Sequence, residues 1–105
     1  MKDSQKIFKI FTPSQWEYFQ KSGVFHGSDL DIKDGFIHLS FADQWQSIWD
    51  KFFNKEEIYL VEICSLDLKF LKIEPNKPGG TKYPHYYGEP LVKKNIKEVT
   101  KILAG

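Results

Sequence analysis

The stretch Asp34-Gly35-Phe36-Ile37-His38-Leu39-Ser40 places an imidazole inside a short apolar run that ends on a hydroxyl. The run from Phe36 to Leu39 is typical of a strand, and side chains two residues apart on a strand point to the same face. His38 and Ser40 are therefore expected to lie side by side. A second polar and aromatic cluster follows at Tyr83-Pro84-His85-Tyr86-Tyr87-Gly88. We expect the two segments to form two walls of one site.

The sequence on either side alternates between strand-like and helix-like patterns. A helix is predicted to begin at Thr12, which forms a capping-box pattern with Gln15, and to end at Gly23. Pro13 suits the first turn of that helix. Strands are predicted at residues 6–11, 36–39, 58–64 and 70–74, with an extended segment at 83–87. Residues 95–103 fit either a strand or a helix, and we favour a strand.

A second helix is predicted after Ser40. Apolar residues recur there at spacings of three and four, which indicates an amphipathic helix whose aromatic stripe faces the core. Ser40 is expected to be its N-cap, and residues 54–57 its end. Residues 27–31 and 33–35 have the composition of loops and turns. The pattern as a whole predicts a single α+β domain over residues 1–105, with two helices. The residues of the apolar stripe are Phe41, Trp45, Ile48, Trp49, Phe52 and Phe53.

Composition narrows the classes of partner. The chain has 105 residues, 41% of them hydrophobic, which is enough for one core. The 15 basic and 14 acidic residues leave a net charge of +1, so there is no electrostatic reason to expect a nucleic-acid or anionic-membrane partner. Every basic residue is lysine. Any phosphate contact must therefore come from lysine, backbone N–H, hydroxyl or histidine groups.

The single cysteine and the N-terminal residues give two further expectations. Cys64 excludes an intrachain disulfide, and its place in the apolar run 58–64 predicts a small buried side chain. Residues 1–6 lead into no long apolar segment. We therefore expect neither a signal peptide nor a membrane span, and a soluble, cytoplasmic protein.

Two classes of site, a metal centre and a serine hydrolase, do not fit the pattern of residues. The three histidines, His26, His38 and His85, match no compact metal-ligand spacing with Cys64, so no metal is expected. His26 is treated as an ordinary exposed side chain. Ser40 follows a strand as the nucleophile of a hydrolase does, but it lacks the flanking glycines of a nucleophile elbow. A helix cap is the simpler role for it.

A nucleotide pocket is the third possibility. His38 can hydrogen-bond a ribose hydroxyl with help from Ser40, and a tyrosine of the second cluster can stack on a planar ring. Glu74 could stabilise positive charge that develops at a sugar carbon. The alternative interpretation is structural: His38 is a satisfied core histidine, the tyrosines are packing residues and Glu74 is a solvated strand end.

Both segments resemble the domain of unknown function 952 family. The first motif comprises Gly27-Ser28, Asp31, the stretch 34–40 and Gln44. The second comprises Glu74, Gly79-Gly80 and residues 83–91. The family pattern in the second motif is Phe-Pro-His-Leu-Tyr-Gly-Pro-Leu, from which this chain departs at Tyr83, Tyr86 and the inserted Glu89.

The resemblance implies a fold and a site. The family is thought to be similar to the ADP-ribosyltransferase group, a mixed or antiparallel split β-sandwich that holds NAD in a cleft. By that resemblance His38 would contact the nicotinamide-side ribose, supported by Ser40. Tyr83 or Tyr87 would stack on nicotinamide, and Glu74 would orient the acceptor or the ribose. The His-Leu-Ser motif also looks like one in the RNA 2′-phosphotransferases, whose phosphate-binding arginines this chain lacks.

These observations give one leading expectation and two alternatives. The leading one is NAD or nucleotide binding with glycosyl transfer to an unknown acceptor. In this scheme His38 and Glu74 are catalytic, and the pocket is completed by Gly27, Ser28, Ser40, Tyr83, His85 and Tyr87. The first alternative is a non-catalytic module that binds a small molecule or a protein on the same fold. The second is a structural protein without a pocket, in which His38 and His85 lie far apart. Whether Glu74 or Glu89 is the relevant carboxylate stays open.

Overall fold

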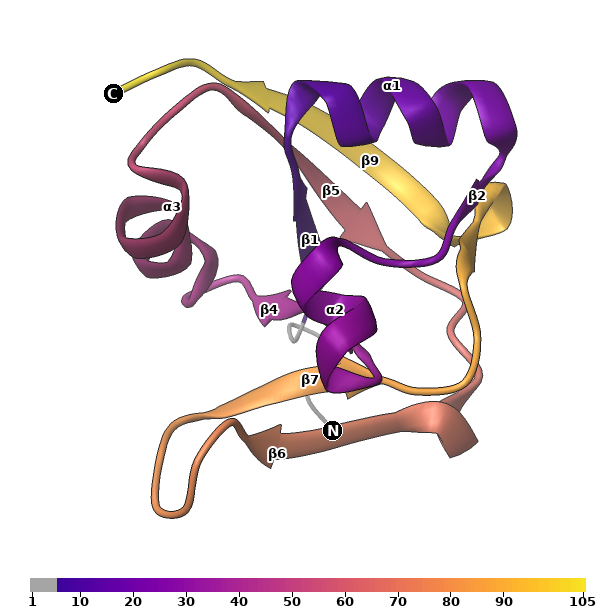
Figure 1. The fold of residues 1–105 in the computed structure, drawn as a ribbon, viewed down its shortest axis with the longest axis vertical. Helices are drawn as coiled ribbons and strands as arrows, with labels where there is room; N and C mark the ends of the chain where they lie inside the picture. The colour runs from indigo at the N-terminus through magenta and orange to yellow at the C-terminus, as the bar shows by residue number, and fades with distance from the viewer. Residues whose placement is uncertain (1–5) are drawn as a thin grey trace.

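The computed structural model describes residues 6–105. The expectation that no signal peptide is present concerns residues that lie largely outside this range. The chain forms an α+β domain in which every strand pairing is antiparallel (Figure 1). The largest sheet contains four strands, in the order β4-β1-β5-β9. Its strands are β1 (Ile7–Phe11), β4 (Ser40–Phe41), β5 (Ile58–Ile63) and β9 (Ile96–Ile102). The strand predicted at the C-terminal end is thus confirmed.

Two smaller sheets complete the β structure. The three-stranded sheet has the order β3-β7-β6 and pairs His38 directly with His85. The two-stranded sheet pairs β2 with β8. Their strands are β3 (Ile37–His38), β6 (Leu71–Pro75), β7 (Lys82–Tyr86), β2 (Val24–Phe25) and β8 (Leu91–Val92). Two short 3₁₀ turns, η1 (Leu68–Phe70) and η2 (Lys93–Asn95), precede β6 and β9.

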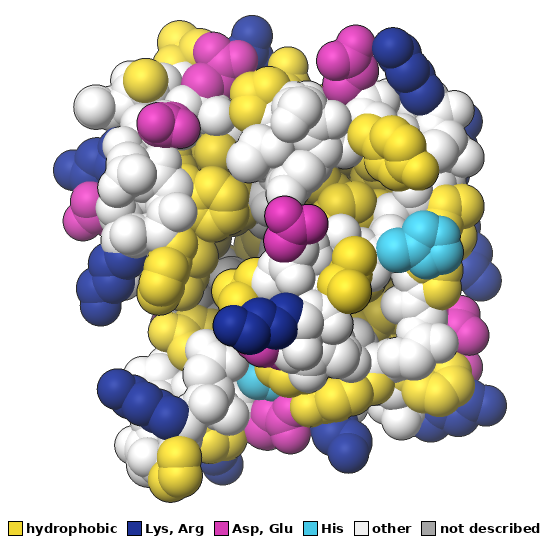
Figure 2. Space-filling view, viewed as in Figure 1, with side chains coloured by type: hydrophobic (Ala, Val, Ile, Leu, Met, Phe, Trp, Pro, Cys, Tyr) yellow, Lys and Arg dark blue, Asp and Glu magenta, His cyan; other side chains and the backbone are white. Residues whose placement is uncertain are grey.

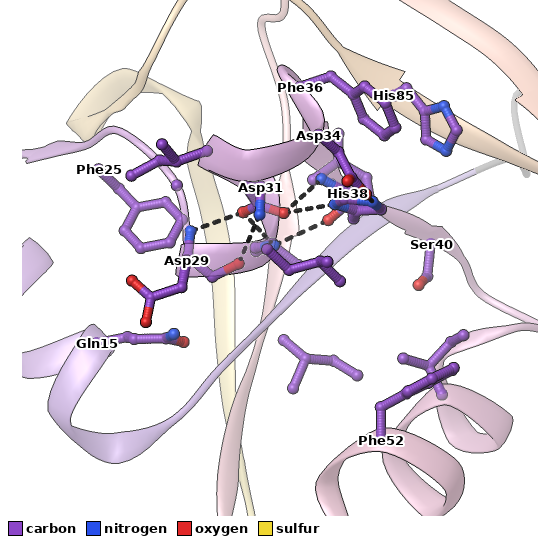
Figure 3. A pocket seen from close by; sticks show the side chains of 18 of the residues that line it. Gln15, Phe25, Asp29, Asp31, Asp34, Phe36, His38, Ser40, Phe52 and His85 are labelled. Carbon is purple, nitrogen blue, oxygen red and sulfur yellow. Dashed lines mark hydrogen bonds and ion pairs between the residues drawn. The ribbon is translucent and has the colours of Figure 1, made fainter. Parts of the chain in front are cut away.

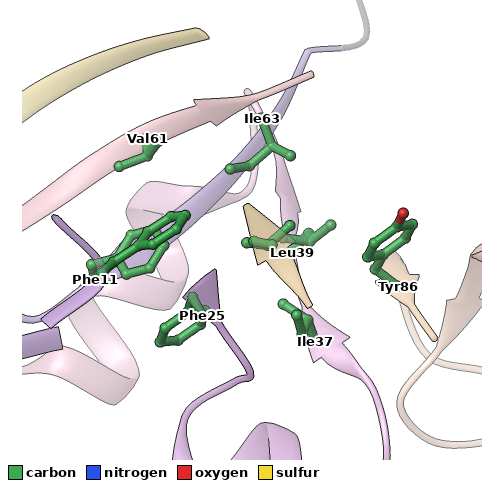
Figure 4. Packing of buried hydrophobic residues seen from close by; sticks show 9 residues of the cluster. Phe11, Phe25, Ile37, Leu39, Val61, Ile63 and Tyr86 are labelled. Atoms are coloured by element: carbon green, nitrogen blue, oxygen red, sulfur yellow. The ribbon is translucent and has the colours of Figure 1, made fainter. Parts of the chain in front are cut away.

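The main core lies where the three sheets meet α1 (Pro13–Ser22). Period-two alternation along β1 and β5 sends Phe11 and Val61 to this side and Ile10 and Leu60 to the other. Phe19 of α1 is fully buried here. Figure 4 shows side chains from all three sheets, which belong to one cluster of buried residues. They include Phe11, Phe25, Ile37, Leu39, Val61, Ile63 and Tyr86.

Helix α1 forms as predicted. Thr12 accepts a hydrogen bond from the backbone N–H of Gln15, whose side chain bonds back to Thr12, and Gly23 ends the helix in the left-handed region at φ 78°. The aromatic stripe of α3 (Trp45–Phe53) covers the second face of the large sheet through Trp45, Ile48, Trp49 and Phe53. Phe52, which we expected in the core, is 70% exposed.

Three expectations about local structure are wrong. The structure has three α-helices among the described residues, because residues expected as loops form α2 (Asp29–Asp34). Ser40 is not a helix cap: it lies in β4 and is 6% exposed, while α3 starts at Trp45 after Gln44, which makes no side-chain capping bond. Cys64 is half-buried rather than buried, at the edge where β5 ends. None of the described helices is long and apolar enough to cross a membrane.

Candidate functional site

An open cleft of about 1310 Å³ separates α3 from α2, and α1 borders it. Figure 2 shows the surface hollowed between these helices, with apolar side chains at the edges. The exposed rings and aliphatic chains of Tyr18, Leu30, Ile32 and Phe52 form part of its lining. Polar side chains of the lining include those of β3, β4 and β7, where His38, Ser40, Tyr83 and His85 lie, and the carboxylates of α2.

Asp31 anchors the polar wall of the cleft (Figure 3). Its side chain is 2% exposed and accepts hydrogen bonds from Lys9 Nζ at 2.9 Å and from the Ser28 backbone N–H at 2.9 Å. Its second oxygen lies 3.0 Å from the His38 backbone nitrogen and 2.6 Å from His38 Nδ1. Burial by itself raises the pKa of Asp31, but the hydrogen bond from His38 and the charge of Lys9 outweigh burial and hold the pKa below its ordinary value.

Lys9 closes the same network from the large sheet. Its ammonium donates to Asp31 and also to the backbone carbonyl of His38 at 3.0 Å. A buried lysine is tolerated when its charge is paired and its protons are bonded, as they are here. Lys9 therefore ties β1, α2 and β3 together at the point where His38 enters the cleft.

His38 is held from both sides. Asp31 faces Nδ1, and Asp34 Oδ2 lies 3.0 Å from Nε2. Asp34 is at the end of α2 and is partly exposed, with 37% of its side chain open to solvent. Both ring nitrogens of His38 are thus engaged with carboxylates, which fixes the ring plane and leaves His38 without a free polar atom.

His85 faces His38 from the neighbouring strand. The two ring centroids are 5.6 Å apart, and Phe36 stacks on His85 at 4.1 Å. Glu74 Oε2 lies 2.8 Å from His85 Nδ1 and also accepts a hydrogen bond from the Tyr87 hydroxyl. The bond from Tyr87 and the bond from His85 lower the pKa of Glu74. Burial and the Glu74 carboxylate raise the pKa of Tyr87 to about 12.

The structure brings most of the expected site residues together. Six of them line the cleft, whereas Glu74 and Tyr87 are absent from its lining and lie behind His85. The close approach of His38 and His85 counts against the expectation of a protein without a pocket. Glu89 is exposed in the loop after β7, so Glu74 is the carboxylate that joins the histidine pair. The six lining residues are Gly27, Ser28, His38, Ser40, Tyr83 and His85.

Gly27 and Ser28 position α2 and Asp31 in the wall of the cleft. A Cβ on Gly27 would lie 2.8 Å from the Cβ of Asp31, and the φ of Gly27 is 126°, so only glycine fits. Ser28 caps α2 and accepts from the Asp31 backbone N–H at 3.1 Å. His26, treated as an ordinary exposed residue, is indeed exposed, although it borders the cleft.

Sequence reasoning missed Lys9 and gave no role to Asp31, Asp34 or Phe36. A signal for Lys9 was present: it lies between Ile7 and Phe11 at a position whose strand neighbours face the core. A charge on a buried strand face requires a buried partner. Among residues 6–105 there is no group of three His, Cys, Asp or Glu side chains arranged to hold a metal ion.

The fold and the cleft define a small α+β domain with two carboxylate-bound histidines on adjacent strands. The sequence model of the family described as "Protein of unknown function (DUF952)" matches residues 10–101, and the chain belongs to this family. A search of curated proteins finds no match.

Solved structures of one bacterial protein share the fold. The crystal structure of protein CC0527 from Caulobacter crescentus matches with a TM-score of 0.80 and 33% sequence identity. The match covers 91% of this chain and 84% of the CC0527 chain. The solution NMR structure of CC0527 has a TM-score of 0.77, with 33% identity over 90% of this chain and 82% of its own.

Proposed function

We propose that the chain is a nucleotide-binding domain of ADP-ribosyltransferase-like architecture that binds NAD and transfers its ADP-ribosyl group to an acceptor. The observation that carries this proposal is the pairing of His38 with His85 in one cleft. The split-sandwich architecture is supported by the shared core, to which the four-stranded and three-stranded sheets both contribute side chains.

The geometry suggests how the roles are divided. His38 reaches a ribose hydroxyl when a ligand displaces the partly exposed Asp34 from Nε2. Ser40 and Tyr83 line the same cleft and supply a hydroxyl and a ring for stacking. Glu74 acts through His85, because it contacts that ring and is not part of the lining. Glycosyl transfer would break the bond between the ribose carbon and nicotinamide and form one to the acceptor, which loses its proton.

Titration of the labelled protein with NAD, followed by NMR at the His38 and His85 rings, tests binding. Saturable shifts at both rings are expected. The His38→Asn variant keeps a donor where Nδ1 stood, so Asp31 stays satisfied while Nε2 is lost. We expect it to bind NAD about tenfold more weakly. Unchanged affinity would show that His38 does not contact the ligand.

Release of nicotinamide separates the enzyme from a binding module. Slow release that depends on His38 supports the transferase, whereas saturable binding without release identifies a non-catalytic module on the same fold. A matched variant is Asp50→Asn, an exposed change on α3 outside the lining, which should leave both readouts unchanged.

A further inference from the structure

The unengaged nitrogen of His85 points to a ligand contact. His85 is 1% exposed, and its Nε2 atom is buried without a hydrogen-bond partner among the described residues. Buried polar atoms in folded proteins are nearly always bonded. Because His85 belongs to the lining of the cleft, a molecule bound there can supply the missing partner.

The state of Nε2 follows from what holds the other nitrogen. Glu74 lies 2.8 Å from Nδ1, and an ionised carboxylate can only accept. Nδ1 therefore carries the proton and donates a hydrogen bond to Glu74. In a neutral imidazole the second nitrogen then presents a lone pair. Tyr87, which donates to the same carboxylate oxygen, holds Glu74 in place for this contact.

His38 does not compete for this role while Asp31 and Asp34 hold its ring. Asp31 and Asp34 occupy both of its ring nitrogens. Of the two facing imidazoles, His85 is the one whose second nitrogen has no partner among residues 6–105.

The charge of the lining selects against phosphate. Three carboxylates line the cleft, and the lysine among the described lining residues, Lys9, is already bonded to one of them. A phosphate beside that lone pair and these carboxylates would meet like charge. A hydroxyl or N–H group would find an acceptor. The lining carboxylates are Asp29, Asp31 and Asp34.

We infer that Nε2 of His85 accepts a hydrogen bond from an O–H or N–H group of an uncharged or cationic ligand moiety, and that any phosphates of the ligand lie away from the histidine pair. This inference rests on the proposed function, since a ribose offers such hydroxyls. Phe36 covers one face of the His85 ring, so the donor approaches in the ring plane. It reaches the nitrogen with a small outward shift of neighbouring lining side chains, because Nε2 has no exposed surface.

The first test needs no ligand. Nitrogen-15 NMR of the folded protein is expected to show His85 protonated at Nδ1 and bare at Nε2. The Glu74→Ala variant should lose this preference and give a mixture of tautomers, whereas Glu89→Ala, a change at an exposed glutamate, should retain it. A proton on Nε2 in the wild-type protein would overturn the inference.

The second test uses two probes, nicotinamide riboside, which has ribose hydroxyls and a cationic ring but no phosphate, and inorganic pyrophosphate. The riboside should shift the Nε2 signal in a saturable way, and pyrophosphate should not. His85→Asn keeps the donor to Glu74 but removes Nε2, so we expect about tenfold weaker riboside binding. His85→Gln restores an acceptor near Nε2 and should recover most of the affinity.

The outcomes separate this inference from the proposed function. A riboside response at Nε2 without any binding of NAD would support the acceptor role and reject the NAD proposal. NAD binding that leaves the Nε2 signal unchanged would reject the acceptor role alone. A response of Nε2 to pyrophosphate but not to the riboside would also overturn it.

Discussion

Asp31 is the residue on which the polar wall of the cleft depends. It satisfies a buried ammonium, the first turn of α2 and both the backbone and the ring of His38. One carboxylate therefore links α2 and the nearby β3 to β1, which lies 22 residues earlier in the sequence. The orientation of the His38 ring therefore depends on a carboxylate to which sequence reasoning assigned no role.

Removing the charge of Asp31 should be costly. Asp31→Asn leaves the Lys9 ammonium buried without a counter-charge, and breaking such a pair typically costs 3–5 kcal/mol, so we expect about that loss in the free energy of unfolding. Urea denaturation followed by tryptophan fluorescence measures it. The matched variant is Asp29→Asn, an exposed change in the same helix, for which at most about 1 kcal/mol is expected from the helix dipole. Equal losses of unfolding free energy for the two variants would contradict the stabilising role of the buried pair of Lys9 and Asp31.

Acid should remove the same stabilisation. The folded pKa of Asp31 lies below the unfolded value of 3.8. Below that value the unfolded chain takes up a proton that the native carboxylate resists, so the stabilisation is complete above pH 3.8 and is lost as the pH falls toward the folded pKa. Urea midpoints of the wild type and Asp31→Asn, measured from pH 7 downward, should begin to converge below pH 3.8. A constant difference would show that ionisation of Asp31 is not the source.

At the scale of elements, sequence patterns predicted the helices and strands that depend on neighbouring residues. The capping box at Thr12 and the alternation in Ile58–Ile63 each involve residues close together in the sequence. Helix α1 and strand β5 both form where they were predicted. Helix α2 was missed because its six residues lack an apolar period: its signals are the capping box of Ser28 with Asp31 and the glycine that ends it. Asp31 also bonds to Lys9 of a distant strand, a contact that no local pattern predicts. Ser40 was misassigned for a similar reason, since pairing with Phe8 draws it into the large sheet.

The site shows the same division. The sequence predicted that the segments carrying His38, Ser40 and His85 form two walls of one site, and the strand pairing of β3 with β7 brings the two histidines face to face. The position of Glu74 behind His85 depends on the register of β6 against β7. Because β6 has no fully buried residue, its hydrophobic pattern specifies that register only weakly.

The cap of α1 gives a test at this scale. Thr12→Ala removes the side-chain acceptor for the Gln15 backbone N–H, and such losses cost about 1 kcal/mol. We expect that decrease in the free energy of unfolding, measured by urea denaturation. Ser14→Ala lies in the same exposed first turn and should cost less than half as much. A Thr12 variant as stable as the wild type would show that Gln15 alone sustains the cap.

At the scale of the molecule, the large sheet separates two unequal apolar clusters. The main cluster contains nine buried residues and receives Phe19 from α1, whereas the second contains three and is covered by α3. No residue of α3 is fully buried. The cleft therefore lies between a firmly packed side, which carries the histidines, and a more weakly packed helix.

This asymmetry predicts which wall of the cleft moves. Backbone amides of α3 should exchange with solvent faster than those of α1, and far faster than those of β5, which is paired on both edges. Hydrogen exchange resolved by NMR measures all three in one experiment, with α1 as the matched helix because it places Phe19 in the main core. Protection of α3 equal to that of β5 would refute the asymmetry. Because Ile48, Phe52 and Phe53 of α3 line the cleft, a ligand bound across it should slow exchange in α3 more than in α1.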